Sequence, residues 1–237
     1  MSKSKADNVY LARRKDLSRS LGKRDVWEFV DHWPLYSGIR NLARYLSITD
    51  LLRSTLDVPG DVAEFGMWRG ANTMLITKTL AILDFFGPKV VHGFDSFAGL
   101  QAIATEDGPA IEMRGQYRGS YDELQSLIDL DGLDGRINIH IGLIEETLPA
   151  FAMQHPETMF SFIYCDTDLY VSTKVILEVL WSRLSRGGLI VFDEWNHSEF
   201  PGEGVAVNDF LHNLVDNFEL VKPPNTEQPT LAIRKLC

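Results

Sequence analysis

Two hydrophobic runs of this sequence each end in acidic residues: Asp166-Thr167-Asp168 follows one run, and Asp193-Glu194 follows the next. A continuous apolar run is typical of a strand buried in a parallel sheet, and open sheets of this kind bind ligands at the carboxyl ends of their strands. Asp166, Asp193 and Glu194 could therefore converge on one point. Three carboxylates repel one another unless a cation neutralises them, and oxygen ligands suit a hard ion such as Mg2+ or Mn2+. The pattern predicts a divalent-metal site.

The same acidic residues also have a purely structural interpretation. Acidic side chains often follow buried strands as helix N-caps, and Asp168 or Glu194 could have that role. Two acidic pairs at the ends of consecutive strands favour the metal site over two separate helix caps.

The composition predicts one soluble α/β domain. The chain has 237 residues, of which 45% are hydrophobic and 24% charged, which is ordinary for a globular protein. No apolar stretch approaches the roughly 20 residues of a membrane span, and the polar start leads to no signal core. The two cysteines, Cys165 in a buried run and Cys237 at the terminus, suit a reducing compartment. We therefore expect a cytoplasmic protein without a membrane partner.

Charge is unevenly distributed along the chain. The net charge is −10, yet residues 1–24 hold eight Lys and Arg residues against Asp7 and Asp16. This segment is predicted to be a basic, flexible leader, and contact with phosphates is the open alternative. The acidic remainder argues against nucleic acid as a partner.

Strand-like and helix-like segments alternate after residue 60, which predicts a doubly wound, mainly parallel sheet of seven strands. The first five strands are expected near 61–66, 89–95, 136–142, 160–166 and 187–193, and a hairpin of 218–222 and 230–234 closes the sheet. Helices are expected near 70–85, 120–130, 145–154, 170–184 and 203–215. We expect a single domain over 25–237 that carries an N-terminal helical extension. The extension, 25–58, is a candidate lid over the site, and the alternative is that its aromatic residues pack against the sheet.

The first two expected strands carry signs of a nucleotide site. The turn after the first strand holds Gly66 and Gly70, an incomplete form of the glycine-rich phosphate turn. Asp95 ends the second strand, where an acidic residue can accept hydrogen bonds from a ribose diol. Glu64 lies inside the first strand and is costly to bury without a partner, which a cofactor's ammonium or a backbone amide could supply. An adenosine-type cofactor is expected.

Four ordered segments of the chain, 60–70, 94–100, 142–149 and 166–173, resemble the macrocin O-methyltransferase family. The resemblance covers about 37–215. It implies a class I S-adenosylmethionine (SAM) fold and the Mg2+-assisted methylation of a sugar hydroxyl in natural product biosynthesis. The chain departs from the family pattern in having Asp193-Glu194 where two aspartates are usual, and Ala71-Asn72 where a further glycine is frequent.

The resemblance also implies a role for individual residues. Glu64, Gly66 and Trp68 would line the methionine end of SAM, and Asp95 and Ser96 would hold its ribose. Gly142, Leu143 and Ile144 would border the adenine, with Glu145 or Glu146 near its amino group. Asp166, Asp193 and Glu194 would bind the metal, and Asp168 would be the general base. The acceptor would be a small sugar or glycoside, and assembly of several copies of the chain is left open.

Two other functions remain as alternatives at this point. A metal-dependent nucleotide-sugar glycosyltransferase could use Asp166-x-Asp168, but it would leave Glu64, Asp95 and the second acidic pair unexplained. A non-catalytic scaffold with a SAM fold would have no need of the acidic residues. His197 could be a base, a further ligand, a substrate contact or a bystander. Methyl transfer is the function that the sequence predicts.

Overall fold

The computed structural model describes Ala12, Lys15 and residues 25–236. Apart from those two positions, the predicted leader lies outside the described residues, as does Cys237. The chain divides into two compact units, Met1–Leu42 and Ala43–Cys237, and each is described by itself. The predicted division into a leader, a lid and one domain stays a prediction. Within the described part of the chain, no helix is both long and apolar enough to cross a membrane.

The N-terminal unit is helical where the structure describes it. Its elements are α2 (Val26–Asp31), α3 (Trp33–Tyr36) and the beginning of α4 (Ile39–Arg53). Asp25 caps α2, since its carboxylate accepts a hydrogen bond from the backbone N–H of Trp27 at 2.9 Å. The rings of Phe29 and Tyr36 meet edge to face with centroids 4.8 Å apart. These contacts fit the predicted helical extension.

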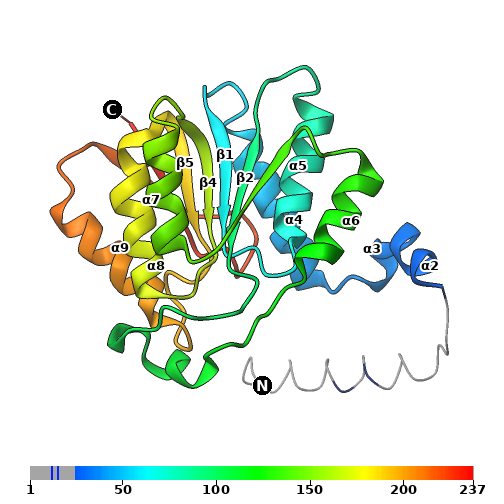
Figure 1. The fold of residues 1–237 in the computed structure, drawn as a ribbon, viewed down its shortest axis with the longest axis horizontal. Coiled ribbons are helices and arrows are strands. Elements are labelled where there is room, and N and C mark those ends of the chain that lie inside the picture. Colours follow the sequence, from blue (N-terminus) through cyan, green and yellow to red (C-terminus); the bar gives the residue numbers. More distant parts are fainter. Residues whose placement is uncertain (1–11, 13–14, 16–24, 237) are drawn as a thin grey trace. The chain divides into compact units, whose positions relative to one another are not determined.

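The larger unit is built on a seven-stranded sheet with the order β3-β2-β1-β4-β5-β7-β6 (Figure 1). The strands are β1 (Asp61–Phe65), β2 (Val91–Asp95), β3 (Ile137–Ile141), β4 (Phe160–Cys165), β5 (Leu184–Phe192), β6 (Phe218–Val221) and β7 (Leu231–Lys235). The first five are parallel, whereas β7 is antiparallel to β5 and β6 is antiparallel to β7. The predicted doubly wound sheet with a closing hairpin is confirmed. The strand order changes direction between β1 and β4, the place where such sheets bind ligands.

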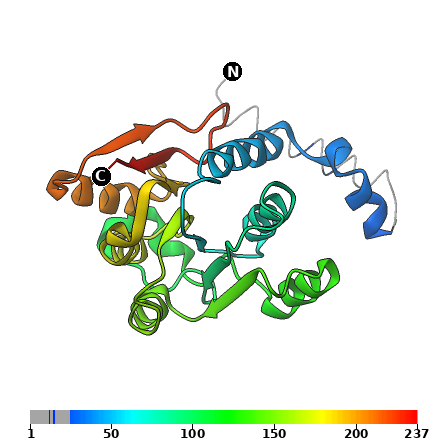
Figure 2. The ribbon, with the colours of Figure 1, turned by 90° about the horizontal axis from the view of Figure 1, so that it is seen from above.

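Helices cover both faces of this sheet, as Figure 2 shows. They include α5 (Ala71–Leu83), α6 (Tyr121–Asp131), α7 (Ile144–Gln154), α8 (Tyr170–Leu180), the 3-10 turn η2 (Trp181–Arg183) and α9 (Pro201–Asn213). Apolar residues of α7, α8 and α9 form one core with the sheet, and those of α4, α5 and α6 form the other. Because both faces of the sheet are covered, every residue of β4 is buried, which explains its unbroken apolar run.

One close approach joins the turn after β1 to the end of β4. Gly66 has φ 81°, and a Cβ atom there would lie 1.8 Å from the carbonyl oxygen of Asp166. A side chain at this position would therefore push the two strand ends apart. The glycine keeps the predicted nucleotide turn beside the acidic strand end.

Two features of the loops differ from the sequence-based expectation. The segment Thr105–Met113 forms the 3-10 helix η1, which the apolar pattern did not predict. Asp107 supports it: one carboxylate oxygen accepts from the N–H of Ala104 at 2.6 Å, and the other accepts from the N–H of Tyr170 at 2.7 Å. β5 also begins earlier than expected, because Leu184 pairs with Phe160 before a shift in register.

Candidate functional site

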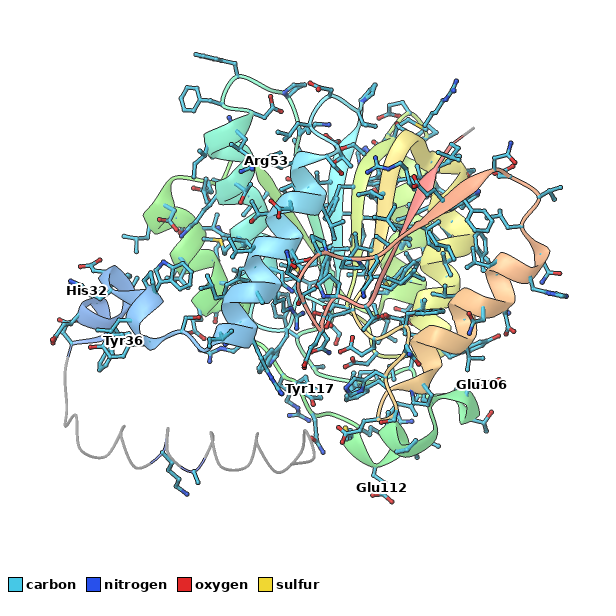
Figure 3. All side chains as sticks on the ribbon, turned by 180° about the vertical axis from the view of Figure 1, so that it is seen from behind. His32, Tyr36, Arg53, Glu106, Glu112 and Tyr117 are labelled. Atoms are coloured by element: carbon cyan, nitrogen blue, oxygen red, sulfur yellow. The ribbon has the colours of Figure 1, made fainter. Side chains whose placement is uncertain are left out.

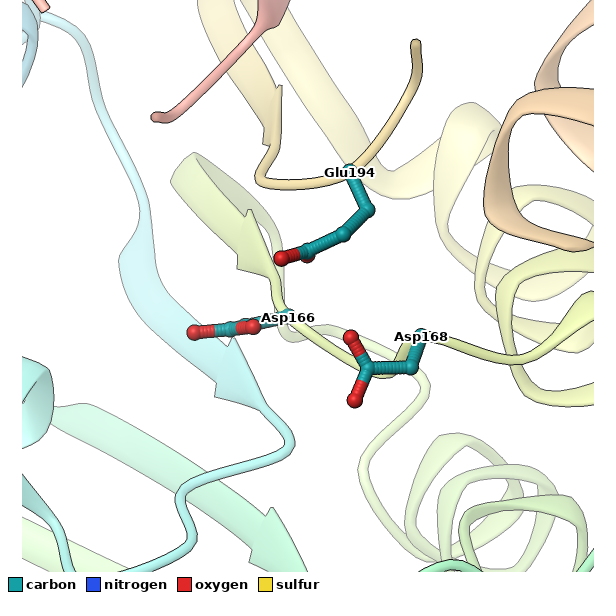
Figure 4. Close-up of side chains that lie close together, drawn as sticks. All are labelled: Asp166, Asp168 and Glu194. Carbon is teal, nitrogen blue, oxygen red and sulfur yellow. The ribbon is translucent and has the colours of Figure 1, made fainter. Parts of the chain in front are cut away.

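Three carboxylates meet where β4 and β5 end. Asp166, Asp168 and Glu194 each offer one oxygen, and these oxygens lie within 4.8 Å of one another (Figure 4). β4 and β5 are parallel neighbours, so residues just beyond their carboxyl ends come together. Oxygen atoms at this spacing could share one hard cation.

The backbone at Asp168 has an uncommon conformation. Its φ is 62°, in the left-handed region that only a few per cent of non-glycine residues occupy. Strained positions of this kind concentrate at functional sites, where the surrounding structure holds them. Asp168 lies three residues beyond the end of β4, and one of its carboxylate oxygens lies close to those of Asp166 and Glu194.

Asp193 lies beside this cluster and has different partners. One carboxylate oxygen accepts a hydrogen bond from the hydroxyl of Tyr164 at 2.5 Å and lies 3.1 Å from the guanidinium of Arg44. The other oxygen is buried without a hydrogen-bond partner. Asp168 thus takes the third place in the cluster, for which the sequence predicted Asp193, and the metal-binding role of Asp193 stays a prediction.

Arg44 of α4 is the cation that pairs with these acidic residues. Its Nη2 atom lies 2.6 Å from Asp166 Oδ2, in addition to its contact with Asp193. Burial by itself would lower the pKa of Arg44, but the carboxylates, Asp166 foremost, raise it above the ordinary value. One fixed positive charge therefore faces several acidic groups.

The acidic groups hold their protons more tightly than usual. Burial raises the pKa of Asp166 and of Glu194 well above the ordinary values, and the charge of Asp193 raises both further. For the same two reasons the pKa of Asp168 is raised to about 7. Each shift reports the free energy needed to ionise several carboxyl groups in one place. A divalent cation bound between these carboxyl groups would favour their ionised forms and lower their pKa values.

Neighbouring residues fix the orientation of Glu194. Glu203, near the start of α9, accepts a hydrogen bond from the backbone N–H of Glu194 at 2.7 Å, and Gln228 donates to Glu194 Oε1 at 2.5 Å. Glu194 Oε2 and Glu203 Oε2 are buried without a hydrogen-bond partner. Glu203 is fully buried, which raises its pKa well above the usual range.

Asp95 joins the loops that follow β1 and β2. Its carboxylate accepts hydrogen bonds from the backbone N–H groups of Trp68, at 2.7 Å, and Phe97, at 2.6 Å. Both donors have positive φ, 51° and 53°. An ionised carboxylate has about four acceptor positions, so capacity for a ribose hydroxyl remains. The predicted ribose contact of Asp95 stays a prediction.

Glu64 is fully buried within β1. Its Oε2 accepts a hydrogen bond from the hydroxyl of Thr73 on α5, whereas Oε1 has no partner. Burial raises its pKa to about 8. A buried carboxylate oxygen without a hydrogen-bond partner can accept from a cationic ligand group.

The remaining predicted cofactor residues lie around the end of β3 and in the loop after β2. The backbone N–H of Gly142 donates to the carbonyl of Asp95 at 3.1 Å, which brings the 142–144 turn beside the β2 end. Ser96 is in the β2 loop, where its hydroxyl accepts from the N–H of Ala98 at 3.1 Å. Glu145 accepts a hydrogen bond from the hydroxyl of Ser172 at 2.5 Å, and Glu146 is exposed.

Sequence reasoning missed several residues that contact the acidic groups, among them Arg44, Tyr164, Glu203 and Gln228. Arg44 is separated from Asp166 by 122 positions, so no local pattern joins them. Tyr164 is one of several aromatic residues in an apolar strand, so the sequence gave no sign that its hydroxyl has a polar partner. Glu203 did offer a signal, because an acidic residue begins the helix that follows the second acidic pair.

Comparison with known proteins agrees with the predicted family and fold. A family model described as macrocin-O-methyltransferase (TylF) matches residues 38–219. The chain is 32% identical over 148 residues to 8-demethyl-8-(2,3-dimethoxy-alpha-L-rhamnosyl)-tetracenomycin-C 4'-O-methyltransferase of Streptomyces olivaceus, covering 58% of this chain and 54% of that one. It is 30% identical over 147 residues to mycinamicin III 3''-O-methyltransferase of Micromonospora griseorubida, covering 58% and 56%. These matches span only about half the length of the curated relatives.

Solved structures resemble the chain over nearly its whole length. CalS11, a calicheamicin methyltransferase, superposes with a TM-score of 0.81 at 25% identity, covering 99% of this chain and 93% of that one. A second structure of CalS11, without ligands, is described as a TDP-rhamnose 3'-O-methyltransferase and has a TM-score of 0.72, with 99% and 95% covered.

Proposed function

Because this chain belongs to the macrocin-O-methyltransferase family, we propose that it transfers a methyl group from SAM to a hydroxyl of a sugar or glycosylated natural product. The relatives named above are O-methyltransferases with such acceptors, which supports methyl transfer over the glycosyltransferase and scaffold alternatives. Sugar methylation is one step of natural product biosynthesis, so the acceptor would be a small molecule.

The observation that carries the proposal is the position of three carboxylates next to the loops expected to hold SAM. We name the two parts by their residues. The cofactor end comprises Glu64 and the 66–68, 95–97 and 142–144 turns, and the metal end comprises Asp166, Asp168, Asp193 and Glu194. Gly66 joins the two ends, since it packs against the carbonyl of Asp166.

The residues of the metal end fit a hard divalent cation. Their donors are carboxylate oxygens, and two of these, Asp193 Oδ2 and Glu194 Oε2, are buried without a partner. We propose that Asp166 and Glu194 hold Mg2+ or Mn2+, with Asp168 or Asp193 as the third ligand. Bound there, the cation would lower the pKa of the acceptor hydroxyl.

The residues of the cofactor end fit SAM. The unpartnered Glu64 Oε1 suits its ammonium, and Asp95, held by two backbone N–H groups, suits its ribose. Trp68 and Ser96 follow the first two strands, and the 142–144 turn would border the adenine. SAM supplies a methyl group that is already electrophilic.

The chain's own residues would then orient the acceptor and move a proton. Asp168, with its pKa raised to about 7, is suited to accept the hydroxyl proton near neutral pH if it is not occupied as a ligand. Tyr164 and Arg44 hold Asp193, and Glu203 and Gln228 hold Glu194. Such supporting contacts keep the carboxylates in fixed positions, and the orientation of an acceptor hydroxyl relative to the methyl donor depends on small displacements of this kind.

The test is a methyl-transfer assay by mass spectrometry with SAM, Mg2+ and a panel of sugar acceptors that includes TDP-rhamnose and a rhamnosylated polyketide. Calorimetry with S-adenosylhomocysteine (SAH) and with UDP- or TDP-sugars accompanies it. We expect SAH to bind and one acceptor to gain a single methyl group. Tight binding of a nucleotide sugar without any binding of SAH would contradict the proposal.

Asp168→Asn separates its two roles. A variant that keeps bound metal but loses roughly 10²–10⁴-fold in rate identifies a base, with partial recovery at high pH. A variant that loses the metal identifies a ligand. Near-parental metal binding and rate would exclude both roles. Asp168 does not cap α8 either, because Leu169 is the N-cap residue of that helix and no side chain caps it.

A further inference from the structure

Aromatic side chains from three separate loops form a row near the acidic cluster. Tyr117 meets Trp68 edge to face, with ring centroids 5.8 Å apart, and lies 6.2 Å from Phe200. The ring of Phe200 is in turn 5.7 Å from His197. We call Trp68, Tyr117, Phe200 and His197 the aromatic row, and Figure 3 labels Tyr117.

The loop that carries Tyr117 is fixed tightly in place. A Cβ atom at Gly119 would lie 1.7 Å from the carbonyl oxygen of Trp68, and one at Gly99 would lie 2.1 Å from that of Gln116. The N–H of Leu100 also donates to Gln116 at 3.1 Å. Two glycines and a backbone hydrogen bond therefore hold the loop against its neighbours.

Two members of the row have a backbone conformation that bulky residues rarely adopt. φ is 61° at Tyr117 and 51° at Trp68. Yet packing does not account for these rings, because Tyr117 is 42% and Trp68 is 50% exposed, in contrast to Phe200 at 6%. The strain holds two large rings at the surface, where neither gains the full stabilisation of burial.

The row connects the two ends of the site. Trp68 donates its backbone N–H to Asp95 at the cofactor end. Phe200 and His197 belong to the loop between β5 and α9, which begins with Asp193 and Glu194 of the metal end. Partial burial raises the pKa of the Tyr117 phenol, and the charges of Asp168 and Glu194 raise it further, so this side chain is within reach of the acidic cluster's field.

We propose that Tyr117 is a substrate-positioning residue, and that the exposed rings of Tyr117 and Trp68 form the surface on which a pyranose ring of the acceptor lies. This inference rests on the proposed function and adds the acceptor-binding surface to it. An acceptor must contact the methyl donor and the acidic cluster together, and Tyr117 lies between the residues assigned to each. A pyranose has an apolar C–H face suited to an aromatic ring and hydroxyls suited to the neighbouring carboxylates.

The test measures sugar binding directly, by saturation-transfer NMR on the full chain loaded with SAH and Mg2+. The probes are methyl α-L-rhamnopyranoside, methyl β-D-glucopyranoside and 4-nitrocatechol, the last as a planar aromatic comparison. Tyr117→Asn removes the ring but tolerates positive φ, so the loop need not rearrange. Tyr117→Phe keeps the ring, and Phe86→Leu, which changes an exposed aromatic residue elsewhere, is the matched control.

We expect Tyr117→Asn to weaken pyranoside binding on the order of tenfold, with SAH affinity and melting temperature near those of the parent. Tyr117→Phe and Phe86→Leu should bind pyranosides as the parent does. Three results would overturn the inference. The parent could fail to bind either pyranoside, or the parent and Tyr117→Asn could bind the pyranosides equally well. The third result is that 4-nitrocatechol binds more tightly than the pyranosides and that its binding depends on Tyr117. Failure to bind SAH would instead count against the proposed function.

Discussion

At the cofactor end of the site, Asp95 accepts hydrogen bonds from two backbone amides, whereas at the metal end Asp193 and Glu194 each keep a buried oxygen without a partner. The first end is organised by backbone geometry, with positive φ at Trp68 and Phe97. The second is organised by charge, with Arg44 paired to two of its carboxylates. A buried charge without full compensation is costly. The metal end should therefore depend on a divalent metal ion for both stability and activity. At the cofactor end the unpartnered Glu64 Oε1 is expected to meet the ammonium of SAM, so that end should not depend on a metal.

The largest expected effect is on turnover at the metal end. Asp166→Asn should reduce kcat by roughly 10²–10³-fold or more, the scale on which removal of one electrostatic contact to the reacting group acts. SAH affinity, measured by calorimetry, should change little, because the cofactor end is held separately. Glu199→Gln, an exposed change in the loop after β5, is the control. Parental turnover in Asp166→Asn with metal-free buffer would show that the cluster has no part in the reaction.

The second effect is on stability without metal. Arg44→Met leaves Asp166 and Asp193 without their cation, and the free energy of unfolding in EDTA should fall by about 2–3 kcal/mol. This is less than for a fully buried pair, because the Arg44 side chain is 26% exposed. Mg2+ should restore more stability to Arg44→Met than to the parent, since the cation replaces the lost charge.

Denaturant unfolding with EDTA or Mg2+ measures both quantities. Arg53→Met is a matched control on the same helix, because Arg53 is 59% exposed and pairs with Asp50 at 4.0 Å. Such a surface pair contributes about 0–1 kcal/mol. Equal losses in the two variants would mean that Arg44 has no special relation to the acidic residues.

The third effect concerns the cofactor end. Asp95→Ala removes the acceptor expected to face the ribose and also frees the N–H groups of Trp68 and Phe97. SAM affinity should fall about ten- to a hundredfold, which corresponds to about 1.5–3 kcal/mol for a charged hydrogen bond. Metal binding should be retained, and calorimetry with SAH and with Mn2+ measures the two separately. Parental SAH affinity would remove Asp95 from the cofactor site.

The two ends also differ in how far the sequence predicts them. The alternation of strands and helices follows from the apolar runs and the turns between them. The same pattern predicts that Asp95, Asp166 and Glu194 lie at strand ends. Asp193 and Glu194 lie just beyond the end of β5, so the alternation of side chains along a strand did not predict their different surroundings. Arg44 was not predicted either, because its partner is 122 positions away and a helix pattern does not tell which charged residue turns inward. The strained loop of Tyr117 was equally hidden, since positive φ at a bulky residue has no sequence signal.

The smallest effect is a difference in pH dependence between the two ends. The pKa of Glu64 at the cofactor end is raised to about 8, and that of Asp168 at the metal end to about 7, mainly by burial. A carboxyl group with a raised pKa binds its proton more tightly in the folded state. Its contribution to stability is therefore complete below the pKa of the unfolded chain and is lost as the pH rises through the folded value. In EDTA, the free energy of unfolding should fall as the pH rises above about 4. Asp166, Glu194 and Glu203, whose pKa values are also raised, contribute to this fall together with Asp168 and Glu64.

Glu64→Gln should remove the contribution of Glu64 to this fall in stability, which extends to about pH 8. Asp168→Asn should remove the contribution of Asp168, which ends near pH 7. In both variants the reason is that an amide does not ionise. Mg2+ stabilises ionised carboxylates. In the parent it should therefore reduce the loss of stability that comes from the metal-end carboxyl groups, and it should leave the loss that comes from Glu64 unchanged. Denaturant unfolding at closely spaced pH values, with and without Mg2+, resolves the two slopes. If Mg2+ abolished the whole fall, or if Glu64→Gln and Asp168→Asn changed the same part of it, the two ends would titrate as one unit. Their separation into a backbone-held end and a charge-held end would then be wrong.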